Sequence, residues 1–250
     1  DGREIVAQLV ATADVVVANL PRAGLQAIGL DYETLTAIKP DIILTTMDAY
    51  GDEGPYADRL GFDGVGQVMS GAAMLTGPLG HPTRSYVPYV DFGTASLAAF
   101  GTVSALYHRD RTGEGQHVQA ALLRTALTFN AHTLTEEALT HKGRTSTHNR
   151  IQTAGPSDIL QTKDGWFIIQ IVGNPLFARL AKLLERDDWL EDERFMTDDG
   201  RGEHGETLSE ALRAWAGGLT LEDAISALND AGVPSAPEDC KMRWARYSAR

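Results

Sequence analysis

The chain has 250 residues, 43% of them hydrophobic and 22% charged, which suffices to bury the core of one or two domains. Its net charge of −12 argues against a broad nucleic-acid surface, although a local pocket could still bind a small anion. The one cysteine, Cys240, allows no internal disulfide and is interpreted as a bystander. No apolar run approaches the roughly 18 residues of a membrane span, and no signal-peptide pattern opens the chain. We therefore expect a cytoplasmic protein with neither nucleic acid nor membrane as partner.

The first part of the chain alternates predicted helices and buried strands. The expected elements are a helix over 4–11, a strand over 13–19, a helix over 32–38 that stops before Pro40, and a strand over 41–46. This order favours a parallel sheet with helices on its faces. Residues 47–63, with three glycines and a proline, are typical of a functional loop.

A long helix containing Asp91 dominates the middle of the chain. It is preceded by an expected helix over 64–75 and a loop over 76–88, and followed by a strand over 117–122 and a helix to about Thr140. The Asp91 helix is rich in glycine and alanine, so we expect it to be buried, and Gly113 or Gly115 can serve as its left-handed stop.

The remaining residues predict a small α+β domain after a polar linker over 141–156. Residues 158–172 predict a hairpin around Lys163-Asp164-Gly165, where Asp-Gly favours a type I′ turn. Helices are expected over 175–184, 206–216 and 221–231, the last between a Thr220 cap and Gly232. Trp166, Trp189 and Trp215 are predicted to be core or domain-contact residues.

Several common chemistries lack their sequence patterns. The chain has no G-x-G-x-x-G after a strand, no P-loop and no G-x-S-x-G nucleophile motif. Its seven histidines are scattered, without the spacing of metal ligands. No metal and no dinucleotide cofactor are therefore predicted.

Asp91 stands at the start of its helix and allows two interpretations. As a helix cap, it would accept a backbone N–H bond worth about 1 kcal/mol. As a covalent nucleophile, it would use the helix N-terminus to stay ionised and to supply donors for a developing oxyanion. Periodicity does not separate the two.

Stretches along almost the whole chain resemble the family III CoA-transferases, which include formyl-CoA transferase and carnitine CoA-transferase. The matching stretches, between about Ala13 and Pro237, are ADVVVANLPRAGLQAIGLDYETLTAIKPDIILTTMDAYGDEGPYADRLGFD, MSGAAMLTG, VPYVDFGTASLAAFGTVSALYHRDRTGEGQHVQAAL, and the late QTKDGWFIIQIVGNPLFARLAKLL with AGVPSAP. Their order and spacing carry the resemblance.

The resemblance implies an α/β fold: a Rossmann-like large domain and a smaller α+β domain, in an interlocked homodimer. The corresponding ranges are 1–140 for the large domain, 141–156 for the linker, 157–235 for the small domain and 236–250 for the start of a return segment. The first βαβ portion is expected before Asp1, and 241–250 matches nothing expected. The implied reaction moves CoA between an acyl-CoA and a carboxylic acid, with Asp91 forming a mixed anhydride and then an aspartyl-CoA thioester. Coenzyme A is then a substrate, and no tightly bound cofactor is expected.

The resemblance also places CoA contacts on two loops. The implied residues are Asn19, Leu20, Arg22, Ile28, Ala49, Tyr50 and Gly51. Two departures affect the phosphate contacts: Pro21 and Arg22 are exchanged relative to the family pattern, and Ala27 and Asp48 stand where relatives often carry a basic residue. Arg22 is the candidate substitute.

Two alternatives remain beside the transferase. The fold also hosts α-methylacyl-CoA racemases, which use a Gly-His-Asp pattern where this chain has Gly61-Phe62-Asp63, so their histidine base is missing. The other alternative is a catalytically inactive CoA-binding remnant.

Overall fold

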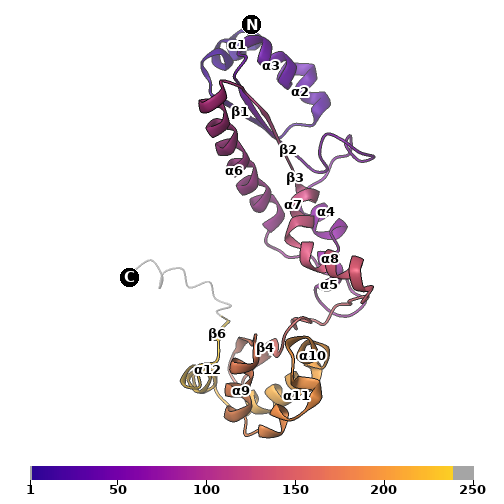
Figure 1. The fold of residues 1–250 in the computed structure, drawn as a ribbon, viewed down its shortest axis with the longest axis vertical. Coiled ribbons are helices and arrows are strands. Elements are labelled where there is room, and N and C mark those ends of the chain that lie inside the picture. The colour runs from indigo at the N-terminus through magenta and orange to yellow at the C-terminus, as the bar shows by residue number, and fades with distance from the viewer. Residues whose placement is uncertain (1, 239–250) are drawn as a thin grey trace. The chain divides into compact units, whose positions relative to one another are not determined.

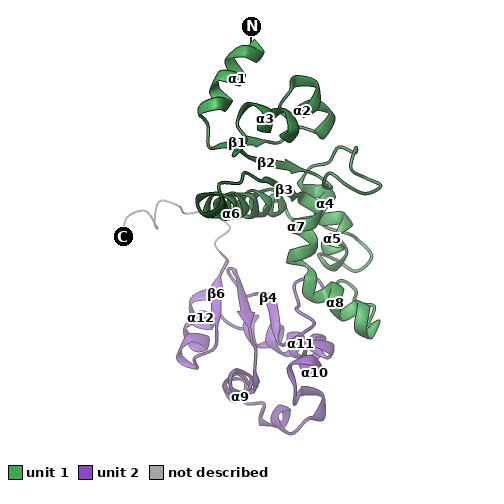
Figure 2. Ribbon diagram, turned by 45° about the horizontal axis from the view of Figure 1, so that its top comes forward, with its two compact units in different colours: residues 1–146 green, residues 147–250 purple. Residues whose placement is uncertain are grey.

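The computed structural model describes residues 2–238, which fall into two compact units divided between Ser146 and Thr147 (Figure 2). The division lies inside the predicted linker. Cys240 and the unmatched segment 241–250 lie outside the described residues. None of the described helices combines the length and the apolar character needed to cross a membrane.

The first unit contains a parallel sheet with strand order β1-β2-β3. Its strands are β1 (Val15–Ala18), β2 (Ile43–Asp48) and β3 (His117–Ala121). The helices are α1 (Gly2–Thr12), α2 (Arg22–Ile28), α3 (Tyr32–Ile38), α4 (Asp63–Met69), α5 (Ala72–Leu75), α6 (Tyr89–Thr112), α7 (Leu122–Phe129) and α8 (Ala131–Thr140). The predicted parallel sheet is confirmed, in a mixed α/β fold.

Side chains of β2 alternate between two layers of helices, as strand geometry requires. Leu44 packs with Val10 of α1 and Leu35 of α3 in one apolar cluster. Thr45 points to the other face, where its hydroxyl lies 2.6 Å from that of Thr102 on α6. The sheet thus lies between α1–α3 and α6 (Figures 1 and 2).

Helix α6 ends at Gly113, which adopts a φ of 78° and is one of the two stops that the sequence predicted; the other, Gly115, has no positive φ. Its small residues, such as Ala98 and Ala105, are buried against the sheet. The prediction of a buried helix is wrong for the opposite face, where Phe92 and Phe100 are 68% and 73% exposed. The small residues bring one face close to its neighbours, and the large ones lie on the other.

Two predicted helices are each broken in two. Residues 64–75 separate into α4 and α5 at Gly71, whose φ is 83°. The helix expected up to Thr140 breaks at Asn130, whose amide donates to the Ser70 carbonyl at 2.8 Å. Helix α2, after Pro21, was not predicted.

The second unit is an antiparallel sheet with strand order β4-β5-β6, packed with helices around its own core. The strands are β4 (Ser157–Gln161), β5 (Trp166–Gln170) and β6 (Ser235–Pro237). The helices are α9 (Asn174–Leu183), α10 (Asp198–Glu203), α11 (Gly205–Ala216) and α12 (Leu221–Asp230), with 3-10 turns at Asp187–Leu190 and Glu193–Phe195. Because β6 pairs with β5, residues 236–237 extend this sheet, whereas the sequence placed them in a return segment.

The hairpin is present, but its turn differs from the prediction. Neither Asp164 nor Gly165 has the positive φ that a type I′ turn needs. The Asp164 carboxylate instead accepts the Leu221 N–H at 2.7 Å, which ties the turn to α12. Trp189 lies in the core as predicted, whereas Trp166 is 40% exposed.

Candidate active site

Asp91 lines a hollow of about 310 Å³ at the carboxyl ends of the parallel strands. Asn19 follows β1, Ala49 follows β2 and Leu122 follows β3, and all three line the same hollow. Carboxyl ends of parallel strands share one edge of a sheet, which is the usual ligand position in open α/β folds. The sequence predicted Asp91 as nucleophile and Asn19 and Ala49 as CoA contacts, and the structure places all three in the lining of one hollow.

Asp91 is the third residue of α6 and does not cap it. The carboxylate of Asp63 accepts the N–H groups of Val90 and Asp91, at 2.8 and 3.2 Å. The Tyr89 and Phe92 N–H groups donate to backbone carbonyls of the preceding turn. All four N–H groups of the first turn are therefore occupied, and the expectation that they stabilise Asp91 or an oxyanion is wrong.

Two properties of the Asp91 carboxylate, its lack of hydrogen-bond donors and its raised pKa, favour reactivity as a nucleophile. It accepts no hydrogen bond from the described residues, and the residue is exposed. The walls of the hollow partly shield its carboxyl from water, which raises its pKa, and the negative charge of Asp63 raises it further. An anion that is poorly stabilised is more basic and hence a better nucleophile.

Asp63 is itself held by a buried amide. Gln67, 1% exposed, donates to the Asp63 carboxylate and accepts the Ser85 N–H at 2.7 Å. These contacts connect α4, the segment before α6, and the first turn of α6. The backbone of Asp91 is thereby fixed from two neighbouring segments.

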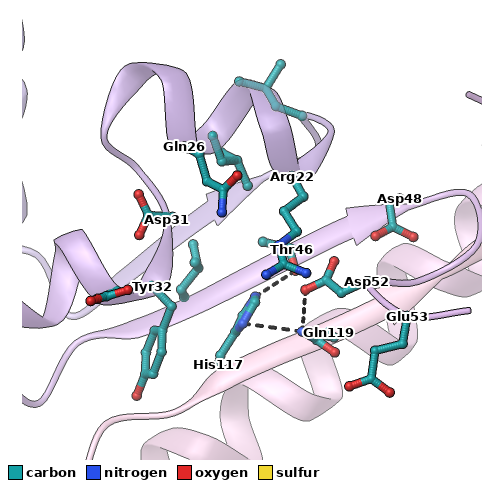
Figure 3. Close-up of a pocket in the computed structure, with 14 residues that line it drawn as sticks. Arg22, Gln26, Asp31, Tyr32, Thr46, Asp48, Asp52, Glu53, His117 and Gln119 are labelled. Atoms are coloured by element: carbon teal, nitrogen blue, oxygen red, sulfur yellow. Dashed lines mark hydrogen bonds between the residues drawn. The ribbon is translucent and has the colours of Figure 1, made fainter. Parts of the chain in front are cut away.

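A second hollow, of about 370 Å³, lies beside the first and shares Asp48 with it. Thr46 and Asp48 of β2 face it together with His117 of β3, and Arg22 reaches into it from α2 (Figure 3). The shared residue makes the two hollows neighbours along one edge of the sheet.

Hydrogen bonds fix the histidine of the second hollow. The Gln119 amide donates to Asp52 and lies 3.4 Å from His117 Nδ1, and Thr46 lies 2.9 Å from His117 Nε2 (Figure 3). The amide nitrogen is a donor, so Nδ1 accepts and Nε2 carries the hydrogen. Burial lowers the pKa of His117, in keeping with a neutral ring, and Tyr32 stacks on it at 5.5 Å.

The second hollow is acidic. Its lining contains one arginine, Arg22, and five carboxylates: Asp31, Glu33, Asp48, Asp52 and Glu53. Burial raises the pKa of Asp48, and the nearby Asp52 charge adds to the effect. An anionic ligand would therefore find in Arg22 the one fully positive group among these lining residues.

The other expected CoA contacts are distributed unevenly. Leu20 and Arg22 line the second hollow, whereas Ile28 lines a third hollow beside α1. Tyr50 pairs with Tyr56, with ring centroids 5.5 Å apart. Gly51 has a φ of 93°, and a side chain there would meet the Arg124 guanidinium at 2.7 Å.

Phe62 lines the Asp91 hollow and is 81% exposed. This is the position where the racemase pattern has its histidine, so a phenyl ring stands in place of that base. Sequence reasoning missed Asp63, Gln67 and His117 as site residues. Asp63 had a usable signal, since it ends the Gly61-Phe62-Asp63 segment that stands where the racemase pattern has its Gly-His-Asp. The one signal for His117 was that it shares a strand face with Gln119.

No described group of three or more His, Cys, Asp or Glu side chains is arranged to bind a metal ion. The two hollows at the strand ends offer carboxylates, amides, hydroxyls, one imidazole and one guanidinium.

The family model for CoA-transferase family III matches residues 1–239. The chain belongs to this family. Among solved structures, a CAIB/BAIF family protein from Brucella suis is 34% identical to this chain with a TM-score of 0.78, over 95% of this chain and 63% of that one. The mixed α/β fold is thus shared with a solved structure.

Curated relatives of the family carry transferase names. A succinyl-CoA–D-citramalate CoA-transferase from Chloroflexus aurantiacus is 33% identical, over 94% of this chain and 59% of the relative. A succinate–glutarate CoA-transferase from Agrobacterium fabrum is 32% identical, over 95% of this chain and 60% of the relative. The chain thus spans about six tenths of the length of these relatives.

Proposed function

We propose that this chain carries the nucleophile of a CoA-transferase that moves CoA between an acyl-CoA thioester and a free carboxylic acid. The observation that carries the proposal is the Asp91 carboxylate, without a hydrogen-bond donor among the described residues, in the hollow where the three parallel strands end. Family membership supplies the reaction class.

The proposed chemistry has two halves. An Asp91 carboxylate oxygen attacks the thioester carbonyl, the C–S bond breaks, and a mixed anhydride and CoA thiolate form. The thiolate then attacks the Asp91 carbonyl of the anhydride, which releases the first acid and leaves an aspartyl-CoA thioester. The acceptor carboxylate repeats these steps in reverse, which returns Asp91 and gives the new acyl-CoA.

For the CoA moiety, we propose that Asn19 and Ala49 contact the part next to the thioester, because they share the Asp91 hollow. Leu20 and Arg22 would then contact a more distant part through the second hollow. Ile28, Tyr50 and Gly51 lie outside both linings and have weaker support as contacts. The interlocked homodimer and the cytoplasmic location also remain proposals, and sedimentation of the full-length protein tests the dimer.

The relatives' names guide the choice of acids. Since they include citramalate and glutarate as well as succinyl-CoA, we propose a short dicarboxylic acid as the acceptor class. The full-length protein should exchange CoA between succinyl-CoA and at least one such acid in a panel that also contains monocarboxylic acids. Absence of exchange with every pair would favour the inactive remnant.

The role of Asp91 has its own test. Asp91→Ala in the full-length protein should abolish exchange while circular dichroism and melting stay close to wild type. In addition, acyl-CoA with hydroxylamine should inactivate the wild type and modify the peptide that contains Asp91. Near-normal turnover of the variant, or an unmodified peptide, would refute the covalent mechanism.

A further inference from the structure

We propose that Asp63 is a positioning residue for the transfer reaction: it holds the main chain of Asp91 and keeps a fixed negative charge beside the Asp91 carboxylate. The inference rests on the proposed role of Asp91 as nucleophile. It adds a second carboxylate, one that never bonds to the substrate, to the working parts of the site.

The contacts of Asp63 are those of an anchored anion. The residue is 6% exposed, and one carboxylate oxygen accepts both the Val90 and the Asp91 N–H. The other oxygen accepts from Gln67. Each of these partners donates, which matches a carboxylate that acts only as acceptor. Hydrogen bonds to a charged acceptor are also stronger than neutral ones.

The charge of Asp63 opposes the charge of Asp91. Other titratable groups near Asp91 are Asp48, which ends β2 and lines the same hollow, and Tyr89 on α6, whose pKa is raised by burial and then by Asp63. Helix α7 lines the hollow with Leu122. The described surroundings of Asp91 are thus dominated by negative charge.

This repulsion favours the first chemical step. When Asp91 forms its bond to the acyl carbon, its negative charge is lost, and the charge leaves with the CoA thiolate. Repulsion from Asp63 is therefore present in the ground state and diminishes toward the transition state. An interaction that changes in this direction accelerates the reaction, whereas one that is equal in both states does not.

A purely structural role for Asp63 makes a different prediction. A helix cap stabilises α6 and leaves the ionisation of Asp91 unchanged, so its loss would alter stability alone. The pH dependence of acylation therefore distinguishes the two roles, since acylation requires ionised Asp91. A neighbouring anion raises the pH at which the acid limb of the rate appears.

The test uses Asp63→Asn in the full-length protein. CoA release is measured in a single turnover with succinyl-CoA over a range of pH. We expect the acid limb to move to lower pH by up to about one unit and the plateau rate to fall by about tenfold, because a carboxylate freed of repulsion is less basic. Asp110→Asn is the matched control: it removes the same charge from an exposed site about 28 Å further along α6.

A second variant separates charge from hydrogen bonding. In Asp63→Asn the new amide faces the donating amide of Gln67, which costs a bond. The double variant Asp63→Asn with Gln67→Glu gives the new amide at position 63 a carboxylate acceptor at position 67, which also accepts the Ser85 N–H. The negative charge then stands at position 67 and no longer next to the Asp91 backbone. Stability should recover, while the acid limb and the plateau stay altered.

The outcomes are distinct. If wild type releases CoA and Asp63→Asn has the wild-type pH profile, the inference is overturned and the function of Asp91 stands. A double variant that regains the wild-type profile together with its stability also overturns it, since Asp63 would then be a cap only. If the wild type releases no CoA, the proposed function and this inference fail together.

Discussion

Gln67→Met removes the amide that holds Asp63 while preserving the length and unbranched shape of the side chain. Two groups lose a partner: the buried Asp63 carboxylate, 6% exposed, and the half-buried Ser85 N–H, which donates to Gln67 at 2.7 Å. A hydrogen bond to a charged group contributes roughly 1.5–3 kcal/mol, and an orphaned donor that is only half-buried costs about 1 kcal/mol, the low end of the range for buried donors. We therefore expect the free energy of unfolding of the first unit to fall by roughly 2–4 kcal/mol, a large part of a typical domain's stability.

Urea unfolding of the chain can assign this loss to one unit. Three of the four tryptophans, Trp166, Trp189 and Trp215, lie in the described part of the second unit, so in a Trp244→Phe background tryptophan fluorescence follows that unit. Far-UV circular dichroism follows both units. Gln67→Met should lower the circular-dichroism midpoint of the first unit and leave the fluorescence midpoint unchanged.

The matched control is Gln161→Met, the same change at an exposed position of the second unit, which should alter stability by less than about 0.5 kcal/mol. A first-unit transition that is identical in Gln67→Met and wild type would refute the view that this amide anchors Asp63. A shift of the fluorescence midpoint would refute the assignment to one unit.

Three further outcomes are expected. Gly93→Ala should destabilise the first unit by about 1–3 kcal/mol, because the new Cβ would lie 2.4 Å from the Phe129 ring. Gly64→Ala should stabilise the unit by up to about 1 kcal/mol, because the nearest contact of its new Cβ is at 3.8 Å and alanine favours a helix. Urea unfolding of both variants checks the two signs. Thr220→Ala should lose the N-cap bond of α12 and about 1 kcal/mol of second-unit stability by tryptophan fluorescence. The pKa of Asp192 is lowered to about 2 by a hydrogen bond from the neighbouring arginine, so its contribution to stability is present above about pH 3.9 and is lost as the pH falls through about 2; an NMR titration midpoint near 4 would contradict this.

Local signals predicted the regular elements well. The helix at Tyr32–Ile38 has the predicted bounds, because Asp31 caps it and Pro40 follows it. By contrast, α2 was missed since Pro21 and Gly24 resemble loop residues, although proline is favoured where a helix begins. The break between α7 and α8 depends on Asn130 reaching the Ser70 carbonyl, a contact over 60 residues that no local pattern encodes.

The candidate site also contains residues that local sequence patterns predicted and residues that they did not. Asp91 was predicted because it stands at the start of a long helix within a recognisable stretch. The cap of that helix could not be predicted from a local pattern, because the residue that accepts its first N–H groups, Asp63, lies 27 residues before Val90 in the sequence. The second hollow was likewise hidden, since His117 and Asp52 meet only when β3 pairs with β2.

Asp48 has a consequence for how ligands in the two hollows influence each other. Because this residue lines both hollows, a ligand that changes the protonation or position of Asp48 from one side alters the free energy of binding on the other side. Such coupling is reciprocal, so each ligand must change the affinity for the other by the same factor. Two separate fragments of the substrate, one for each hollow, would therefore raise or lower each other's affinity. Asp48→Asn would reduce this coupling by the same factor for both fragments.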